Sequence, residues 1–113
     1  MKLKSFALGL IVALFSLGAW AGANHDHSNL PPVDAATAQQ NATQIVQTMV
    51  QRGVIEPTWK TIKAKSAEQK LFGGHPEWIV VFVNDAVAEE SKRTLYVFLS
   101  PQGQYLAANY PGN

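Results

Sequence analysis

The residues with the most evident chemistry are two histidines near the N-terminus. His25 and His27 flank Asp26, and two imidazoles beside a carboxylate form a donor set that Cu(II), Ni(II) or Zn(II) accepts. Three ligands on an open chain, without a preformed cage, bind a metal ion weakly, and a solvated segment that binds no metal is the alternative. The sequence therefore predicts at most a weak metal site at His25, Asp26 and His27, and no other cofactor.

The remaining polar residues form no catalytic pattern. Ser66, Ser91 and Ser100 lack the Gly-x-Ser-x-Gly context of an activated serine. The chain has no cysteine, which removes thiol catalysis and Cys-ligated zinc. No spacing pairs two carboxylates on one helix face for acid–base work, and Gly73-Gly74 is not followed by the Lys-Ser/Thr of a phosphate loop. We therefore expect a protein that is not an enzyme.

Four side chains are candidates for a binding surface. His75 follows two glycines and precedes a proline, so its imidazole is expected in a loop, where it can bind a ligand or carry a proton. Trp59, Tyr105 and Tyr110 belong to a large set of aromatic residues, and an exposed aromatic patch marks an interaction surface. The alternatives are a plain surface turn for His75 and core packing for the aromatic rings.

Residues 1–21 have the pattern of a secretory signal peptide. Lys2 and Lys4 give a basic start, an apolar run follows over residues 6–17, and Ala19 and Ala21 provide the small side chains that a signal peptidase reads. Cleavage after Ala21 predicts a periplasmic protein that is no longer associated with a membrane. Retention of the segment as an uncleaved anchor is the alternative.

Composition limits the rest of the chain to one small domain. Removal of residues 1–21 leaves 92 of the 113 residues. It also removes two of the nine Lys and Arg residues and none of the eight Asp and Glu residues, so the remaining formal charge is −1. A near-neutral chain without a basic stripe has no electrostatic reason to bind nucleic acid. We expect residues 22–32 to be a disordered leader and residues 33–113 to form a single domain.

A helix is predicted over residues 34–52. Asp34 is a good N-cap, and Gly53 suits the left-handed residue that ends a helix. Apolar side chains then recur at helical spacing and form one stripe: Ala38, Ala42, Ile45, Val46, Met49 and Val50.

Antiparallel strands follow the helix. Residues 78–83 and 93–99 are rich in β-branched and aromatic side chains. Residues 100–103 have the Pro and Gly of a hairpin turn, and residues 104–109 supply the partner strand. Residues 61–65 alternate weakly, and we expect them to form an edge strand. The predicted fold class is α+β, with one N-terminal helix packed on a three- to four-stranded antiparallel meander.

The two long strands are apolar on both faces, although one helix covers only one face of a sheet. We place six residues on the uncovered face: Ile79, Val81, Val83, Leu95, Val97 and Leu99. Three kinds of cover remain open for them: the connector around Ile55, Trp59 and Phe72, a second copy of the chain in a homodimer, or a bound partner.

Four strings in the domain carry a resemblance to known proteins: SAEQKLFGG over residues 66–74, EW at 77–78, KRTLYVFLS over 92–100 and GQYLAAN over 103–109. With them the chain resembles a family of small exported bacterial proteins with a His-containing leader, known only as a domain of unknown function. In its helix, its meander and its Gly-x-Tyr-Leu ending, the chain is also similar to PepSY-like domains. That similarity implies a role in peptidase inhibition or ligand binding.

Together these observations predict an exported, non-catalytic binding or inhibitory module that holds a peptide or protein partner on its sheet. The alternative is a weak periplasmic metal-binding protein that acts through the histidine leader.

Overall fold

The computed structural model describes residues 30–113, and its first element is helix α2 (Ala35–Gln51). The Asp34 carboxylate accepts a hydrogen bond from the Thr37 backbone N–H at 2.9 Å, which satisfies one of the free donors of the first turn. Arg52 is the C-cap, and Gly53 follows with a positive φ. The helix predicted over residues 34–52, including its two caps, is confirmed.

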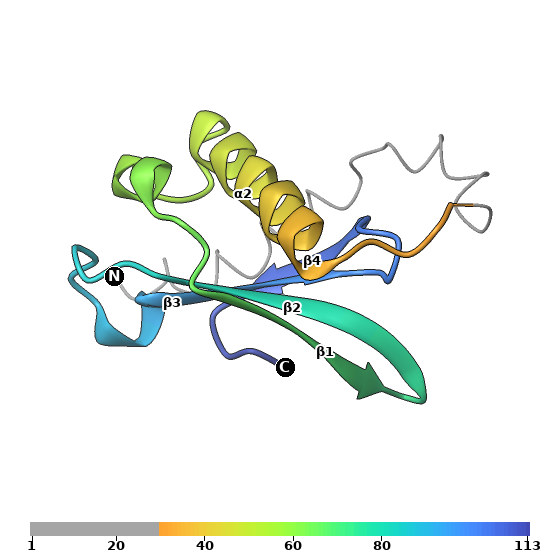
Figure 1. Ribbon diagram of the computed structural model, residues 1–113. Coiled ribbons are helices and arrows are strands. Elements are labelled where there is room, and N and C mark those ends of the chain that lie inside the picture. Colours follow the sequence, from red (N-terminus) through yellow and green to blue (C-terminus); the bar gives the residue numbers. More distant parts are fainter. Residues whose placement is uncertain (1–29) are drawn as a thin grey trace.

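The four strands pair in the order in which they occur in the sequence. They are β1 (Ser66–Phe72), β2 (His75–Val83), β3 (Thr94–Leu99) and β4 (Tyr105–Asn109), joined antiparallel in one sheet. Helix α2 crosses one face of this sheet (Figure 1). Two short 3-10 helices complete the chain, η2 (Pro57–Thr61) after α2 and η3 (Glu90–Lys92) before β3. The α+β fold with a meander is confirmed.

The edge strand lies one segment later than predicted. Residues 61–65 contain the end of η2 and an extended connector, and the edge strand is β1, at residues 66–72. The reason is the turn that follows it. Gly73 and Gly74 both have positive φ, as a two-residue hairpin turn requires, and this turn pairs Phe72 directly with His75. The register then makes residues 66–72 the partner of β2, despite their polar composition.

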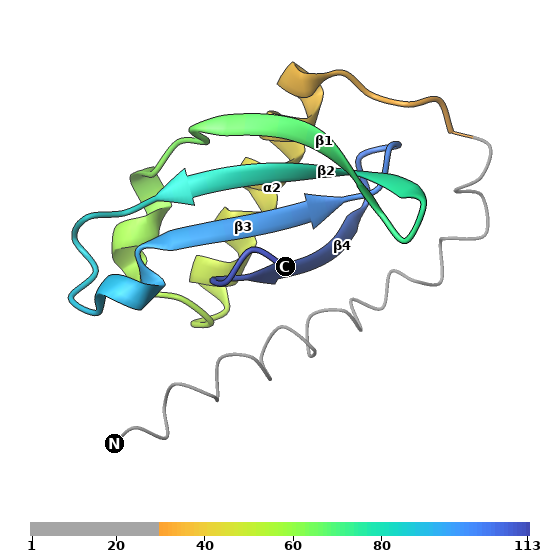
Figure 2. The ribbon, with the colours of Figure 1, turned by 90° about the horizontal axis from the view of Figure 1, so that it is seen from below.

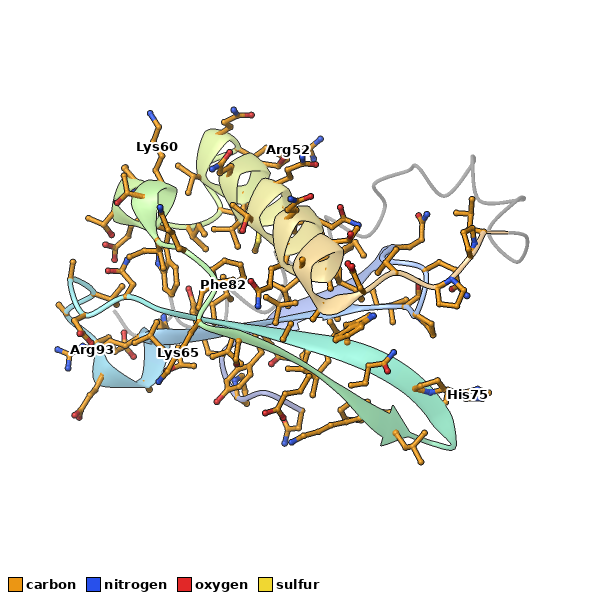
Figure 3. The ribbon with its side chains drawn as sticks, in the orientation of Figure 1. Arg52, Lys60, Lys65, His75, Phe82 and Arg93 are labelled. Atoms are coloured by element: carbon orange, nitrogen blue, oxygen red, sulfur yellow. The ribbon has the colours of Figure 1, made fainter. Side chains whose placement is uncertain are left out.

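The main core fills the space between α2 and the sheet. The helix contributes Ala38, Ala42, Val46 and Met49, all of them buried. The sheet contributes seven buried residues to the same core: Trp78, Val80, Phe82, Leu95, Val97, Leu99 and Ala108. Figure 3 shows Phe82 between the sheet and the helices.

The assignment of strand residues to the uncovered face was half wrong. Leu95, Val97 and Leu99 lie on the helix side, because Val97 pairs directly with Val80 and directly opposed residues share a face. Without the register, the alternation of one strand does not show which of its faces matches the neighbouring strand. The sheet face opposite α2 is therefore formed by Ile79, Val81 and Val83 from β2 with Tyr96 and Phe98 from β3.

Two parts of the same chain cover much of that face. The Phe72 ring meets the Phe98 ring edge-on, with centroids 5.8 Å apart and an interplanar angle of 77°. The C-terminal segment passes below the sheet on the side opposite α2 (Figure 1 and Figure 2). Of the connector residues expected here, only Phe72 contributes, because Ile55 and Trp59 belong to the helix-side core.

Candidate binding face of the sheet

A hollow of about 110 Å³ opens on the sheet face opposite α2. It lies between the edge strand and the C-terminal segment, and its walls come from β1, β2, β3 and one residue near the C-terminus. The lining residues are Ser66, Glu68, Lys70, Ile79, Val81, Tyr96 and Gly112. The hollow is therefore built from segments distant in sequence, which the meander brings side by side.

The two sides of the hollow differ in chemistry. Its floor is apolar, because Ile79 and Val81 project from β2 to this face. Its outer rim is polar, because the β1 register pairs Ser66 with Val81 and Glu68 with Ile79, which puts alternate β1 side chains on the same face. Ser66, Glu68 and Lys70 make no side-chain hydrogen bond or ion pair among the described residues. They are free to contact a partner.

Gly112 closes the hollow against the Tyr96 ring. Its φ is +85°, a left-handed conformation that glycine adopts without strain. A Cβ at this position would lie 2.9 Å from two Tyr96 ring carbons. The Gly112 N–H donates to Asn109 Oδ1 at 2.7 Å, which fixes the segment just after β4. The sequence analysis did not predict that Gly112 lines this hollow. The Pro-Gly pair at residues 111–112 is typical of a turn and was the one indication in the sequence that the chain turns here.

The four residues predicted as a binding surface lie in separate places. Trp59 is only 1% exposed and belongs to the helix-side core. His75 is exposed at the far end of the β1–β2 hairpin (Figure 3). Tyr105 begins β4 and Tyr110 follows its last residue, and both are partly buried against the helix-side core. The structure does not bring the four together, and none of them lines the hollow.

Burial changes the acidity of both tyrosines. It raises the pKa of Tyr105 to about 12. Burial also raises the pKa of Tyr110, and the negative charges of Glu56 and Glu89 raise it further. Both phenols therefore stay neutral at physiological pH and act as packing groups with a polar end.

A buried asparagine, also missed from the sequence, organises the loop between β2 and β3. Asn84 is 2% exposed. Its amide donates to Thr58 Oγ1 at 3.0 Å, and its Oδ1 accepts from the Ala86 N–H at 3.0 Å. At the other end of the loop, Arg93 Nε donates to the Val87 carbonyl at 2.7 Å. These bonds hold the loop against η2 and so shape the domain rather than the hollow.

The predicted metal ligands His25, Asp26 and His27, the predicted signal peptide and most of the predicted leader lie outside the described residues. Between residues 30 and 113 there is no group of three or more His, Asp or Glu arranged to hold a metal ion. In the same part of the chain no helix has both the length and the apolar character needed to cross a bilayer.

Comparison with known proteins places the chain in a family. The model of a family of unknown function (DUF6488) matches residues 1–113, and the chain belongs to that family. No curated protein and no solved structure matches the chain.

Proposed function

We propose that the protein is an exported, non-catalytic module, similar in layout to PepSY-like domains, that holds an extended segment of a peptide or protein partner against the sheet face opposite α2. The observation that carries this proposal is the hollow on that face, which has an apolar floor at Ile79 and Val81 and a polar rim on β1. An apolar floor with a few polar groups at its edge is the usual composition of a binding site.

The size of the hollow favours a peptide over a small-molecule ligand. Sites for drug-sized molecules have volumes of about 300–1,000 Å³, well above the 110 Å³ found here. An apolar cavity of about 150 Å³ accepts a benzene ring, so this hollow has room for one medium-sized side chain. A single side-chain pocket beside a strand is a common way to read an extended peptide, whose alternate residues point to the same side.

The rim gives such a segment both kinds of polar partner. The Glu68 carboxylate accepts hydrogen bonds, the Lys70 ammonium donates them, and the Ser66 hydroxyl does both. An apolar side chain in the hollow would therefore leave the partner's neighbouring N–H and C=O groups within reach of β1 side chains.

Export is the part of the proposal that depends on residues 1–21. The basic start, the apolar run and the small residues at Ala19 and Ala21 support it. The test is expression of the full chain in a bacterium, followed by fractionation and N-terminal sequencing. We expect the periplasmic fraction to contain a chain that begins at Gly22. An intact N-terminus in the membrane fraction would show an uncleaved anchor instead.

The binding role is tested by filling the hollow. Ser66→Phe places a ring at the rim, and Ser91→Phe makes the same change at an exposed residue of η3, away from the lining residues. Peptides that bind the wild-type protein are selected from a random library of extended peptides. Their affinities for the two variants are then measured, and backbone amide resonances are followed by NMR during titration.

We expect the selected peptides to bind wild type and Ser91→Phe alike, to bind Ser66→Phe at least tenfold more weakly, and to shift the amide resonances of Ser66, Val81 and Gly112. Unfolding curves of both variants show whether the fold is retained. Equal binding to all three proteins, or shifts confined to the helix side, would refute this site.

A further inference from the structure

Strand β1 has a free edge. It pairs with β2 and with no other described strand, and it forms the outer border of the sheet (Figure 2). An unpaired strand exposes a row of backbone N–H and C=O groups that can pair with another strand. The opposite border, β4, carries an irregularity in its pairing with β3 at Phe98/Leu99. Such irregularities discourage pairing at an edge, so β1 is the border better suited to a partner.

We propose that β1 pairs antiparallel with β1 of a second copy of this chain, about a two-fold axis that passes through Gln69. The pairing joins two four-stranded sheets into one continuous sheet with both α2 helices on the same face. It follows from the side chains of β1 and does not depend on the proposed peptide binding.

The charges of β1 are complementary to themselves in this register. Glu68 and Lys70 stand on either side of Gln69, so the axis places Glu68 opposite Lys70 of the second copy, and the reverse pair forms by symmetry. Opposite charges that face each other across an antiparallel pair stabilise it. Both side chains are exposed and neither has an ion-pair partner among the described residues.

The same register accounts for the most exposed large apolar side chain in the described chain. Leu71 is 71% exposed, and its pairing with Pro76 puts it on the same face as Gln69 and α2. The two-fold at Gln69 places Leu71 opposite Ala67 of the second copy, a small residue against which the leucine can pack. The exposed Leu71 is then covered by the dimer.

Neighbouring registers are less favourable. A two-fold centred on Glu68 would set two carboxylates opposite each other, and one centred on Lys70 would oppose two ammonium groups. Like charges in direct opposition destabilise a strand pair. With the axis at Gln69, Lys65 instead lies opposite Gly73 of the second copy, which has no side chain. Lysines at sheet borders usually prevent pairing, but in this register no two of them are opposed.

Charge reversal tests the register. Sedimentation velocity over a concentration series gives the dimer dissociation constant for the purified protein and for Glu68→Lys, Lys70→Glu and the double variant. Each single reversal replaces two attractive pairs by two repulsive ones, and we expect a dissociation constant raised roughly tenfold or more. The double variant restores both pairs and should dimerise like wild type. Lys60→Glu, which makes the same charge change on η2 far from β1 (Figure 3), should have no effect.

A cross-link tests the position of the axis. The chain has no cysteine, so Gln69→Cys introduces the only thiol. Opposed residues of an antiparallel pair have Cα atoms about 4.5–5.5 Å apart, inside the range of roughly 4.4–6.8 Å that a disulfide spans. We expect Gln69→Cys to give a covalent dimer under mild oxidation and Lys60→Cys to remain mostly monomeric.

A protein that stays monomeric throughout the concentration series would overturn the proposal. A dimer that is insensitive to both single reversals would also overturn it, because another surface would then form the interface. Oligomeric state is measured without any peptide, so this outcome is separate from the test of the binding hollow.

Discussion

Replacement of Asn84 by alanine is expected to destabilise the domain by about 2 kcal/mol. The change removes two hydrogen bonds, to Thr58 Oγ1 and from the Ala86 N–H, both 3.0 Å long. A hydrogen bond of this kind contributes roughly 0.5–1.5 kcal/mol. Thr58 and Ala86 are exposed residues, so water can take the place of the Asn84 amide at both of them. The larger cost of a buried unsatisfied group therefore does not apply. The two bonds therefore set the magnitude.

Urea unfolding followed by tryptophan fluorescence measures this loss, with a lower midpoint and an unchanged m-value as the expected result. In a domain of this size a loss of about 2 kcal/mol lowers the melting temperature by roughly 10 °C. Thr58→Val removes one of the two bonds at an exposed residue. A double-mutant cycle with Asn84→Ala should give a coupling of about 0.5–1.5 kcal/mol between the two side chains.

A loss below about 0.5 kcal/mol would refute this reasoning, because it would mean that the loop from residue 84 to residue 93 holds its place without Asn84. A loss above about 4 kcal/mol would also contradict it, since two solvent-replaceable bonds cannot supply that much.

Three further outcomes are expected. Trp78→Ala and Phe98→Ala, at residues 8% and 5% exposed on opposite faces of the sheet, should each cost roughly 3–5 kcal/mol in denaturant unfolding; a cost below about 1 kcal/mol would show a ring that is not packed. Burial raises the Tyr105 pKa from 10.0 to about 12, so between these pH values the folded state keeps a proton that the unfolded state loses. Stability should therefore fall as the pH rises from about 10 to about 12. An absorbance titration in which every tyrosine ionises near pH 10 would contradict this. Copper(II) or nickel(II) titrated into the purified chain should bind weakly and lose that binding in the His25→Ala, His27→Ala double variant; equal affinity in both proteins would exclude the leader as the metal site.

The helix could be predicted closely from the sequence because its determinants are local. Asp34, the apolar stripe and Gly53 all act within a few residues, and the structure has the helix between the caps they indicate. The three later strands were also found, since β-branched and aromatic runs bounded by turns mark strands without knowledge of their partners. Only β1 was misplaced. Its residues are polar and have no strand pattern of their own, and they form a strand because the Gly73-Gly74 turn pairs them with β2.

The candidate site could not be predicted in the same way. The hollow depends on register, which decides that Ser66 and Val81 lie side by side, and on the return of Gly112 beneath Tyr96. Neither appears as a pattern within one segment. The aromatic residues chosen from composition, such as Trp59, turned out to pack in the core, because large rings are as useful for filling a small core as for meeting a partner.

The order of the strands has a consequence for the speed of folding. Each strand pairs with the one that follows it in the chain, in the order β1-β2-β3-β4. Every pair of neighbouring strands is therefore a hairpin, joined by the loop between them. Short loops close quickly and cost little entropy. The docking of α2 on the sheet joins more distant parts of the sequence, as does the contact between the Phe72 and Phe98 rings. We therefore expect folding in a single phase that is faster than the folding of a sheet of the same size with crossovers. We also expect the helix to dock on hairpins that have already formed.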